Sequence, residues 1–216
     1  MTDLPSFHTA RLRLRPVVLQ DAPALLEMSD TRSPGVWIGY GPLADLEAAE
    51  IFAEWMMMIG RKAIPDICWA IERHGTPGLI GLCQFKQWDP VERVALIGYE
   101  MARAHQGQGF MAEALEAALW GCFNGFGLRH LDAHVHPGNV PSVRLLQRLG
   151  FTEQGGLPGG ETVLGKTYEM QVWRRQPDAA APAASATRGG TDAPHSRTRR
   201  GRAARSAAPA PSRAEA

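Results

Sequence analysis

A glycine-rich turn at residues 106–109, Gln-Gly-Gln-Gly, constrains this chain more than any other feature. A strand-like run, residues 94–101, ends shortly before the turn, and a helix-like run, residues 111–123, follows it. A helix that starts at such a turn leaves its first backbone N–H groups unpaired and adds the positive end of its dipole. Glycine also lets the backbone approach a ligand closely. The turn therefore predicts an anion site, most often one for phosphate, although such turns also occur as plain structural corners.

A second helix start follows later in the chain, and the helix it begins is predicted at residues 139–149. Asn139 suits its N-cap, Pro141 its first turn, and Gly150 the position just after its end. Its apolar stripe consists of Val143, Leu146 and Leu149. Together with the glycine-rich turn, this helix start narrows the kind of phosphate ligand that the chain is built to bind.

With these two elements the chain resembles the GNAT superfamily of acyl-CoA-dependent N-acetyltransferases. Residues 106–109 look like the pyrophosphate loop of that family, and Asn139, Ser142 and Gly150-Phe151 look like its late CoA-binding helix. The flanking residues 97–99 and 111–114 are similar to those of the Rim-type ribosomal-protein N-terminal acetyltransferases. Met111 is a departure, because the general motif has Gly or Ala there. The resemblance covers residues 9–175.

This resemblance implies a fold, a co-substrate and a set of site residues. The fold is a mixed α/β fold, in which a mostly antiparallel sheet of about six to seven strands has helices on both faces. The co-substrate is acetyl-CoA, and no metal is implied. The loop at residues 33–42 is placed beside the acceptor, with Trp37 and Tyr40 as substrate-binding residues. The implied cofactor-binding residues are Tyr99, Met101, Gln106, Gly107, Gln108, Gly109, Phe110, Met111, Ala112, Asn139 and Ser142.

Hydrophobic periodicity gives a compatible order of elements. Strands are predicted at residues 10–16, 67–73, 79–88, 94–101, 130–136, 151–155 and 166–174. Helices are predicted at 21–29, from 45 to 59, at 111–123 and at 139–149. The second helix should pack one face on the sheet, formed by Ile51, Phe52, Trp55, Met56 and Ile59. The alternative is that Trp55 and the three methionines that follow it form a flexible binding face.

Amide formation from a thioester requires a neutral amine, a polarised carbonyl and a stabilised leaving thiolate. Backbone N–H groups of the strand at residues 99–101 can polarise the carbonyl. Glu100 is the candidate general base, with a plain ion pair to Arg103 as the alternative. The resemblance places Ser142 near the pantetheine sulfur, and the alternative is that Ser142 only helps to start its helix.

His134 is a further candidate proton acceptor. It shares a strand face with Asp132 and His136, while the residues between them face the core. A metal site is disfavoured here, because three ligands from one strand rarely converge and no fourth ligand is evident.

The acceptor can be narrowed by the acidity of amines. An α-amino group has a pKa of about 7.7–8.0, so roughly a tenth of it is already neutral near pH 7, whereas lysine at about 10.4 is almost entirely charged. A modest base therefore favours a protein N-terminus, acetylated by direct attack in a ternary complex. The alternatives are a small-molecule acceptor (an amino sugar, a polyamine or an antibiotic), a non-catalytic acyl-CoA sensor, and a nucleic-acid-associated adaptor.

Composition agrees with one folded domain, since 44% of the residues are hydrophobic. The N-terminal residues contain no apolar run typical of a signal peptide, and the apolar run at residues 52–59 is too short for a membrane span. Cys68, Cys83 and Cys122 are widely spaced in apolar runs, which favours buried free thiols over a disulfide. We therefore expect a cytoplasmic protein.

The composition changes abruptly near Gln176. Residues 177–216 contain no large apolar side chain and carry seven arginines against three carboxylates. Such a segment cannot offset its ordering entropy by burial, so we expect a disordered tail. Its arginines either make weak RNA or ribosome contacts or have no function. The sequence does not distinguish a monomer from a homodimer.

Overall fold

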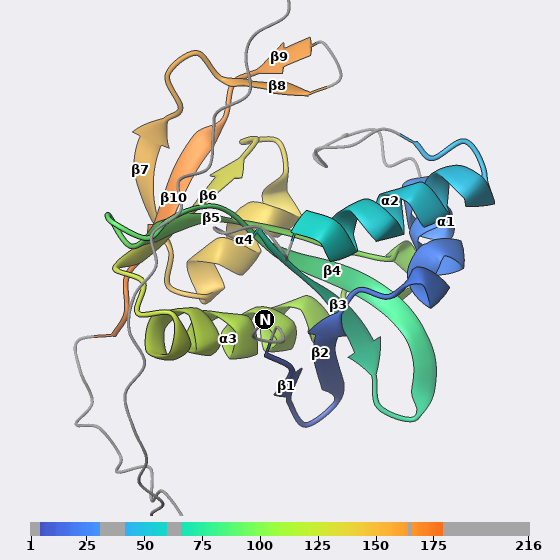
Figure 1. Ribbon diagram of the computed structural model, residues 1–216. Coiled ribbons are helices and arrows are strands. Elements are labelled where there is room, and N and C mark those ends of the chain that lie inside the picture. Colours follow the sequence, from blue (N-terminus) through green and yellow to red (C-terminus); the bar gives the residue numbers. More distant parts are fainter. Residues whose placement is uncertain (1–4, 31–41, 60–65, 164–165, 179–216) are drawn as a thin grey trace, which may run out of the picture. The chain divides into compact units, whose positions relative to one another are not determined.

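The computed structural model describes residues 5–30, 42–59, 66–163 and 166–178 (Figure 1). Within these residues the helices are α1 (Ala22–Asp30), α2 (Leu46–Ile59), α3 (Phe110–Trp120) and α4 (Val140–Arg148). The strands are β1 (Phe7–His8), β2 (Leu12–Pro16), β3 (Ile67–Arg73), β4 (Thr76–Asp89), β5 (Val94–Met101), β6 (His130–Val135), β7 (Thr152–Gly156), β8 (Glu161–Val163), β9 (Lys166–Tyr168) and β10 (Gln171–Arg175). Trp37, Tyr40 and the predicted tail beyond Asp178 lie outside the described residues.

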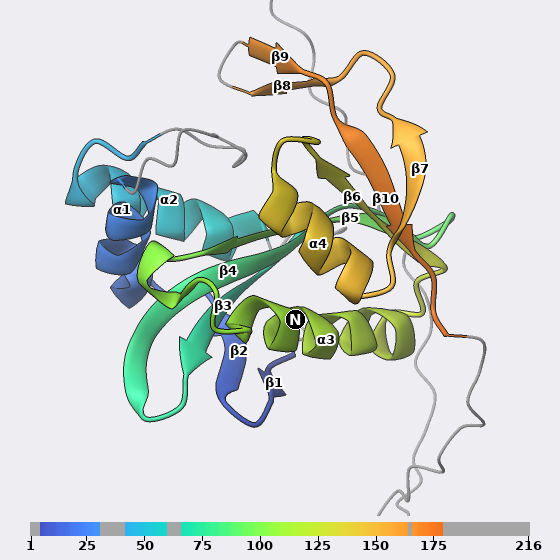
Figure 2. The same cartoon turned by 180° about the vertical axis from the view of Figure 1, so that it is seen from behind.

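Eight strands form one mixed sheet in the order β1-β2-β3-β4-β5-β6-β10-β7. Neighbouring strands are antiparallel except for β5 and β6, which are parallel because the segment containing α3 carries the chain back between them. α1 and α2 cover one face of the sheet, and α3 and α4 cover the other (Figures 1 and 2). The predicted mixed α/β fold is confirmed.

Two details differ from the predicted strands. β1 is only two residues long, which is too short to produce a periodic pattern, and it brings the sheet to eight strands. The strand predicted at residues 166–174 is two strands: β9 pairs with β8 in a separate hairpin, whereas β10 lies between β6 and β7. The chain turns into this hairpin at Gly159 and Gly160, which both have positive φ (78° and 68°).

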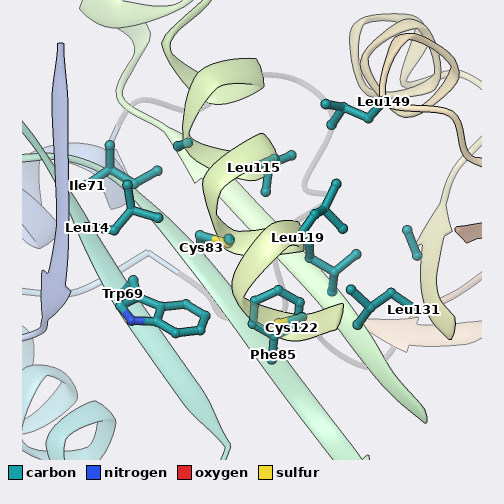
Figure 3. Close-up of a cluster of buried hydrophobic side chains, with 14 of the residues drawn as sticks. Leu14, Trp69, Ile71, Cys83, Phe85, Leu115, Leu119, Cys122, Leu131 and Leu149 are labelled. Atoms are coloured by element: carbon teal, nitrogen blue, oxygen red, sulfur yellow. The ribbon is translucent and has the colours of Figure 1, made fainter. Parts of the chain in front are cut away.

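The alternation of side chains along the strands divides the core into two clusters. On β3, Trp69 and Ile71 point toward α3 and α4, whereas Cys68 and Ala70 point toward α1 and α2. Figure 3 shows the first cluster, in which Leu115 and other α3 side chains pack on the sheet. The central strands β3 and β4 supply residues to both clusters, because adjacent residues on one strand face opposite sides of the sheet.

The packing of α2 confirms Phe52, Met56 and Ile59 of the predicted apolar face and corrects Ile51 and Trp55. Ala49, Ala53 and Met56, together with Ile59, are buried, but the side chains of Ile51 and Trp55 are 61% and 50% exposed. Ala49 and Ala53 face the core cluster on the sheet, so Ile51 and Trp55 lie on other sides of the helix. The three methionines divide in the same way, since Met56 is buried and Met58 is exposed.

The three cysteines are buried and unpaired, as predicted. Burial raises the pKa of the Cys68 thiol to about 12 and raises the pKa of the Cys83 and Cys122 thiols further still. Among the described residues, no helix is long and apolar enough to cross a membrane.

Candidate active site

A gap between the two parallel strands creates the cavity. β5 and β6 are paired only from Val94 with His130 to Leu96 with Asp132. Beyond these pairs both strands line a cavity of about 1120 Å³. β4 stays paired with β5 as far as Gly81 with Met101, so one edge of β5 is covered and the other faces the gap.

The open edge of β5 exposes backbone donors. The N–H of Ala102 donates to the Ile80 carbonyl on β4 at 2.9 Å. Backbone groups of a strand alternate between its two edges, so the N–H groups of Tyr99 and Met101 are directed toward the gap. They belong to the strand segment whose N–H groups are predicted from the sequence to polarise the thioester carbonyl.

The side chains along the gap divide between the two faces of the sheet. Tyr99 lies opposite Cys83, which belongs to the α3 and α4 cluster, and Glu100 lies opposite Leu82, which belongs to the α1 and α2 cluster. On β6, Ala133 belongs to the α3 and α4 cluster, so the adjacent His134 faces the other way. The cavity therefore has an α3/α4 side, with Tyr99, and an α1/α2 side, with Glu100 and His134.

On the α3/α4 side, the glycine-rich turn has the conformation that its sequence indicates. Gly107 and Gly109 have φ of 72° and 78°, values that other residues rarely adopt, and Gly109 is the N-cap of α3. The side chain of Gln106 donates to the Met101 carbonyl at 2.9 Å. The N–H of Glu113 is bonded to the Gly109 carbonyl at 3.2 Å, so the preceding N–H groups of the first turn have no carbonyl partner within the helix. This loop has the geometry of an anion site.

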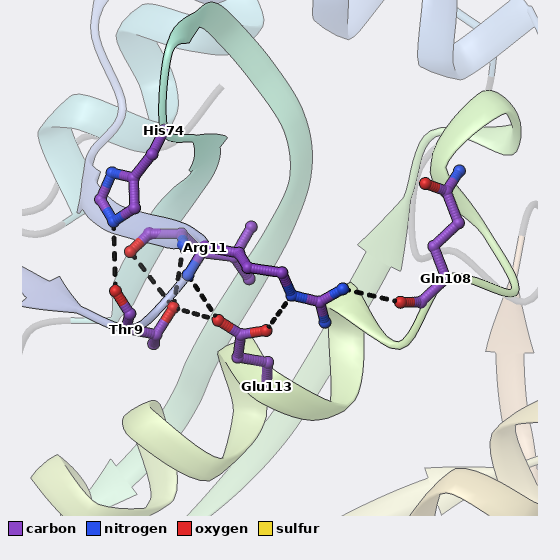
Figure 4. Close-up of polar contacts among 6 residues, drawn as sticks. Thr9, Arg11, His74, Gln108 and Glu113 are labelled. Carbon is purple, nitrogen blue, oxygen red and sulfur yellow. Dashed lines mark hydrogen bonds and ion pairs between the residues drawn. The ribbon is translucent and has the colours of Figure 1, made fainter.

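The outer side of the same loop contacts the start of the chain (Figure 4). The Glu113 carboxylate accepts hydrogen bonds from the Thr9 hydroxyl at 2.5 Å and from the Arg11 backbone and Nε at 2.9 and 2.6 Å. Arg11 Nη1 also donates to the Gln108 carbonyl at 3.2 Å. Sequence reasoning missed these residues because about a hundred positions separate the two segments and no local pattern links them.

The start of α4 contacts β5 across the cavity. Asn139 is the N-cap, as predicted, and its Oδ1 accepts a hydrogen bond from the Ser142 N–H at 3.3 Å. The Ser142 hydroxyl is 2.5 Å from the Tyr99 hydroxyl. Burial raises the pKa of Tyr99 to about 12, although the Ser142 hydrogen bond partly offsets the effect. Tyr99 is therefore a neutral phenol near pH 7, and the two hydroxyls form one hydrogen-bonding pair.

On the α1/α2 side, acidic and aromatic side chains line the cavity. Glu161 of β8 lies there with its Oε2 3.6 Å from His134 Nδ1. Phe52 and Trp55 of α2 stack at 5.7 Å between ring centroids with an interplanar angle of 8°. Sequence reasoning missed Glu161, because the hairpin that carries it was not predicted. An acidic residue next to a glycine pair was its only local signal.

The structure brings most of the predicted site residues to this one cavity. Its lining includes Tyr99, Glu100, Met101, Gln106, Gly107, Gly109, Phe110, Met111, Ala112, His134, Asn139 and Ser142. Gln108 is not in the lining, since its amide donates to the Ala104 carbonyl at 2.9 Å. Asp132 binds Arg174 through two bonds of 2.7 Å and takes no part in the site. In the described part of the chain no cluster of three or more His, Cys, Asp or Glu residues could hold a metal.

The cavity thus has a glycine loop with unpaired helix N–H groups on one side of the sheet and the side chains of Glu100 and His134 on the other. This arrangement is typical of an enzyme that holds a phosphate-bearing co-substrate beside the group with which it reacts. Residues 11–152 match the acetyltransferase (GNAT) domain. The chain belongs to this family, and it is an acetyl-CoA-dependent N-acetyltransferase.

Individual relatives agree with the family assignment. The chain is 30% identical to the uncharacterized N-acetyltransferase YoaA of Bacillus subtilis over 169 residues, which are 78% of this chain and 95% of that protein. It is similar to a Vibrio cholerae structure whose proposed activity is that of a ribosomal-protein-serine acetyltransferase (26% identity, TM-score 0.72, 82% of this chain and 100% of that one). The ribosomal L7/L12 α-N-protein acetyltransferase RimL, solved with coenzyme A, shares the fold (20% identity, TM-score 0.70, 82% and 100%).

Proposed function

We propose that this enzyme acetylates the α-amino group of a protein or peptide N-terminus by direct attack on acetyl-CoA. The observation that supports this proposal is the division of the cavity by the sheet. An anion site and the Tyr99–Ser142 pair lie on the α3/α4 side, and Glu100 and His134 lie on the α1/α2 side. The gap between β5 and β6 lets the two reactants meet.

The α3/α4 side suits acetyl-CoA. The first-turn N–H groups of α3 and the glycine loop would hold the pyrophosphate. The backbone N–H groups of Tyr99 and Met101 would polarise the thioester carbonyl at the gap. The cavity lining includes none of the three cysteines, which supports direct attack by the amine over a covalent acyl-enzyme.

The reaction forms a C–N bond, breaks the C–S bond and moves one proton away from the amine. Glu100 is the proposed base for that proton, and His134 with Glu161 behind it is the second candidate, because a carboxylate near one ring nitrogen helps to orient the other. A thiol has an ordinary pKa of about 8.5, well below the pKa of about 12 of Tyr99. The Tyr99–Ser142 pair therefore stabilises the leaving thiolate by hydrogen bonding rather than by giving up a proton.

The pKa values of amines again narrow the choice of acceptor. A carboxylate base suits an amine that is partly neutral near pH 7, which an N-terminus is and a lysine is not. Two similar proteins are described in terms of ribosomal proteins: one as a ribosomal L7/L12 α-N-protein acetyltransferase and the other, as a proposed activity, as a ribosomal-protein-serine acetyltransferase.

A panel of acceptors tests the proposal. The full chain is assayed with acetyl-CoA and three kinds of amine: peptides with a free N-terminus, the same peptides blocked at the N-terminus but carrying lysine, and amino sugars and polyamines. We expect kcat/KM for free N-termini to exceed that for the blocked peptides by at least about tenfold, as their pKa values require. Preference for an amino sugar or polyamine over every peptide would transfer the assignment to small-molecule acetylation. Binding of acetyl-CoA without turnover of any acceptor would favour a sensor.

A further inference from the structure

The glycine loop is fastened to the body of the domain through Arg11 (Figure 4). Beyond its hydrogen bond to the Gln108 carbonyl, the Arg11 guanidinium lies over the Phe110 ring, 4.5 Å from the centroid. Its Nη2 would be 3.6 Å from a Cβ placed on Gly109. Arg11 is therefore packed against three consecutive residues, at the point where the loop becomes α3.

The loop needs a contact from outside its own segment, such as the one that Arg11 makes. Gly107 and Gly109 adopt left-handed conformations and are exposed, so this backbone has the widest conformational freedom that a chain allows. Its own side-chain contacts, from Gln106 to Met101 and from Gln108 to Ala104, remain within one short segment. The first connects the turn to the end of β5 and the second stays within the turn, so neither reaches a part of the chain that is distant in sequence.

The negative charge of Glu113 must be compensated if the nearby loop is to bind an anion. Its carboxylate lies about one helical turn from the proposed anion site, where an uncompensated negative charge opposes the binding of another anion. Burial alone would raise the pKa of Glu113, but hydrogen bonds from Thr9 and Arg11 outweigh it and hold the pKa below its ordinary value. The carboxylate is thus charged near neutral pH, and the Arg11 guanidinium neutralises it.

We propose that Thr9, Arg11 and Glu113 are positioning residues for acetyl-CoA, which fix the glycine loop in its anion-binding shape without lining the cavity themselves. The inference rests on the proposed function of that loop as the pyrophosphate site. It adds a determinant of co-substrate affinity that is distant in sequence, contributed by the turn between β1 and β2.

Calorimetric titration of the full chain with CoA, which needs no acceptor, tests this inference. Arg11→Gln removes the guanidinium, and Thr9→Val removes one hydrogen bond to Glu113. Arg174→Gln is the matched control, because it breaks a comparable partly exposed ion pair, with Asp132, that does not line the cavity. We expect the Kd for CoA to rise about tenfold in Arg11→Gln and about threefold in Thr9→Val, with no change in Arg174→Gln.

Two further measurements separate positioning from plain stability. With a working acceptor, Arg11→Gln should raise the KM for acetyl-CoA and leave kcat within about twofold. Arg11→Lys should fail to restore affinity, because a single ammonium cannot bridge Glu113 and the Gln108 carbonyl as the planar fork does. Folded Arg11→Gln and Thr9→Val proteins with the parent's Kd would overturn the inference while leaving the loop assignment intact. A parent protein that binds no CoA would instead overturn the proposed function, and this inference with it.

Discussion

On the α3/α4 side of the cavity the binding groups come mainly from the backbone, whereas on the α1/α2 side they come from side chains. In the proposed function, the glycine loop and the open edge of β5 would act through backbone N–H groups, which almost every residue possesses, so backbone conformation determines that side. Glu100, His134 and Glu161, which line the other side, would act through the chemistry of their side chains. One side can therefore keep a common co-substrate while substitutions on the other change the acceptor.

The two sides also differ in charge. The first turn of α3 presents a positive dipole end, and Arg11 compensates the nearby Glu113. The α1/α2 side presents the carboxylates of Glu100 and Glu161. In the proposed site these charges would favour an anionic co-substrate on one side and a cationic amine on the other, although Lys86 on the α1/α2 side partly offsets the carboxylates.

The strongest test of this division is Glu100→Gln. If Glu100 is the base, kcat should fall about a hundredfold near pH 6, where the neutral amine is scarcest, and the deficit should shrink toward pH 9. The Kd for CoA, measured by calorimetry, should not change, because the substitution lies on the other face of the sheet. Glu161→Gln is the matched comparison, since it removes the same charge from the same side. A larger, pH-dependent loss in Glu161→Gln with a nearly normal Glu100→Gln would assign the proton to His134 and Glu161.

A complementary change on the α3/α4 side is Gly109→Val. The Kd for CoA should rise at least about tenfold, because a branched side chain both strains a positive φ and blocks close approach to the backbone. Gly127→Val is the control: its φ of 65° imposes similar strain, no atom lies within 4 Å of the added Cβ, and it is not in the cavity lining. Unchanged affinity in a folded Gly109→Val protein would remove the loop from the co-substrate site.

The smallest of these three effects concerns the Tyr99–Ser142 pair on the α3/α4 side. Ser142→Ala and Tyr99→Phe should each lower kcat about fivefold to tenfold with little change in the KM for acetyl-CoA, because the pair acts as the thiolate leaves. The double variant should be scarcely worse than either single one, since each removes the same hydrogen-bonding unit. Losses confined to the melting temperature, with normal kcat, would show that Ser142 only supports the start of α4.

The sequence allowed the loop and α4 to be predicted because their signals are local. Two glycines before a helix, and Asn139 three residues before Ser142, determine backbone conformation within a few residues. The alternation on β6 likewise placed Leu131 in the core and His134 away from it, as the structure confirms.

The remainder depends on contacts between distant segments, which local patterns do not encode. Thr9 meets Glu113 only because β2 passes beside α3, and Glu161 reaches His134 only because β10 inserts next to β6. The face of α2 was misjudged for a related reason. The prediction rested on hydrophobicity, which favours Trp55 over Ala53 for the buried face. In the structure Ala53 is buried and Trp55 is half exposed.

The burial of the cysteines has a practical consequence for following the reaction. The thiolate is the nucleophile that reacts with thiol reagents, and the three raised pKa values leave almost none of it in the folded enzyme near neutral pH. Free CoA released by turnover should therefore react quickly with a chromogenic disulfide while the protein contributes little background. Once the chain unfolds, its three cysteine thiols become reactive. Without substrates, the rate at which they react with the same reagent therefore measures the rate of unfolding.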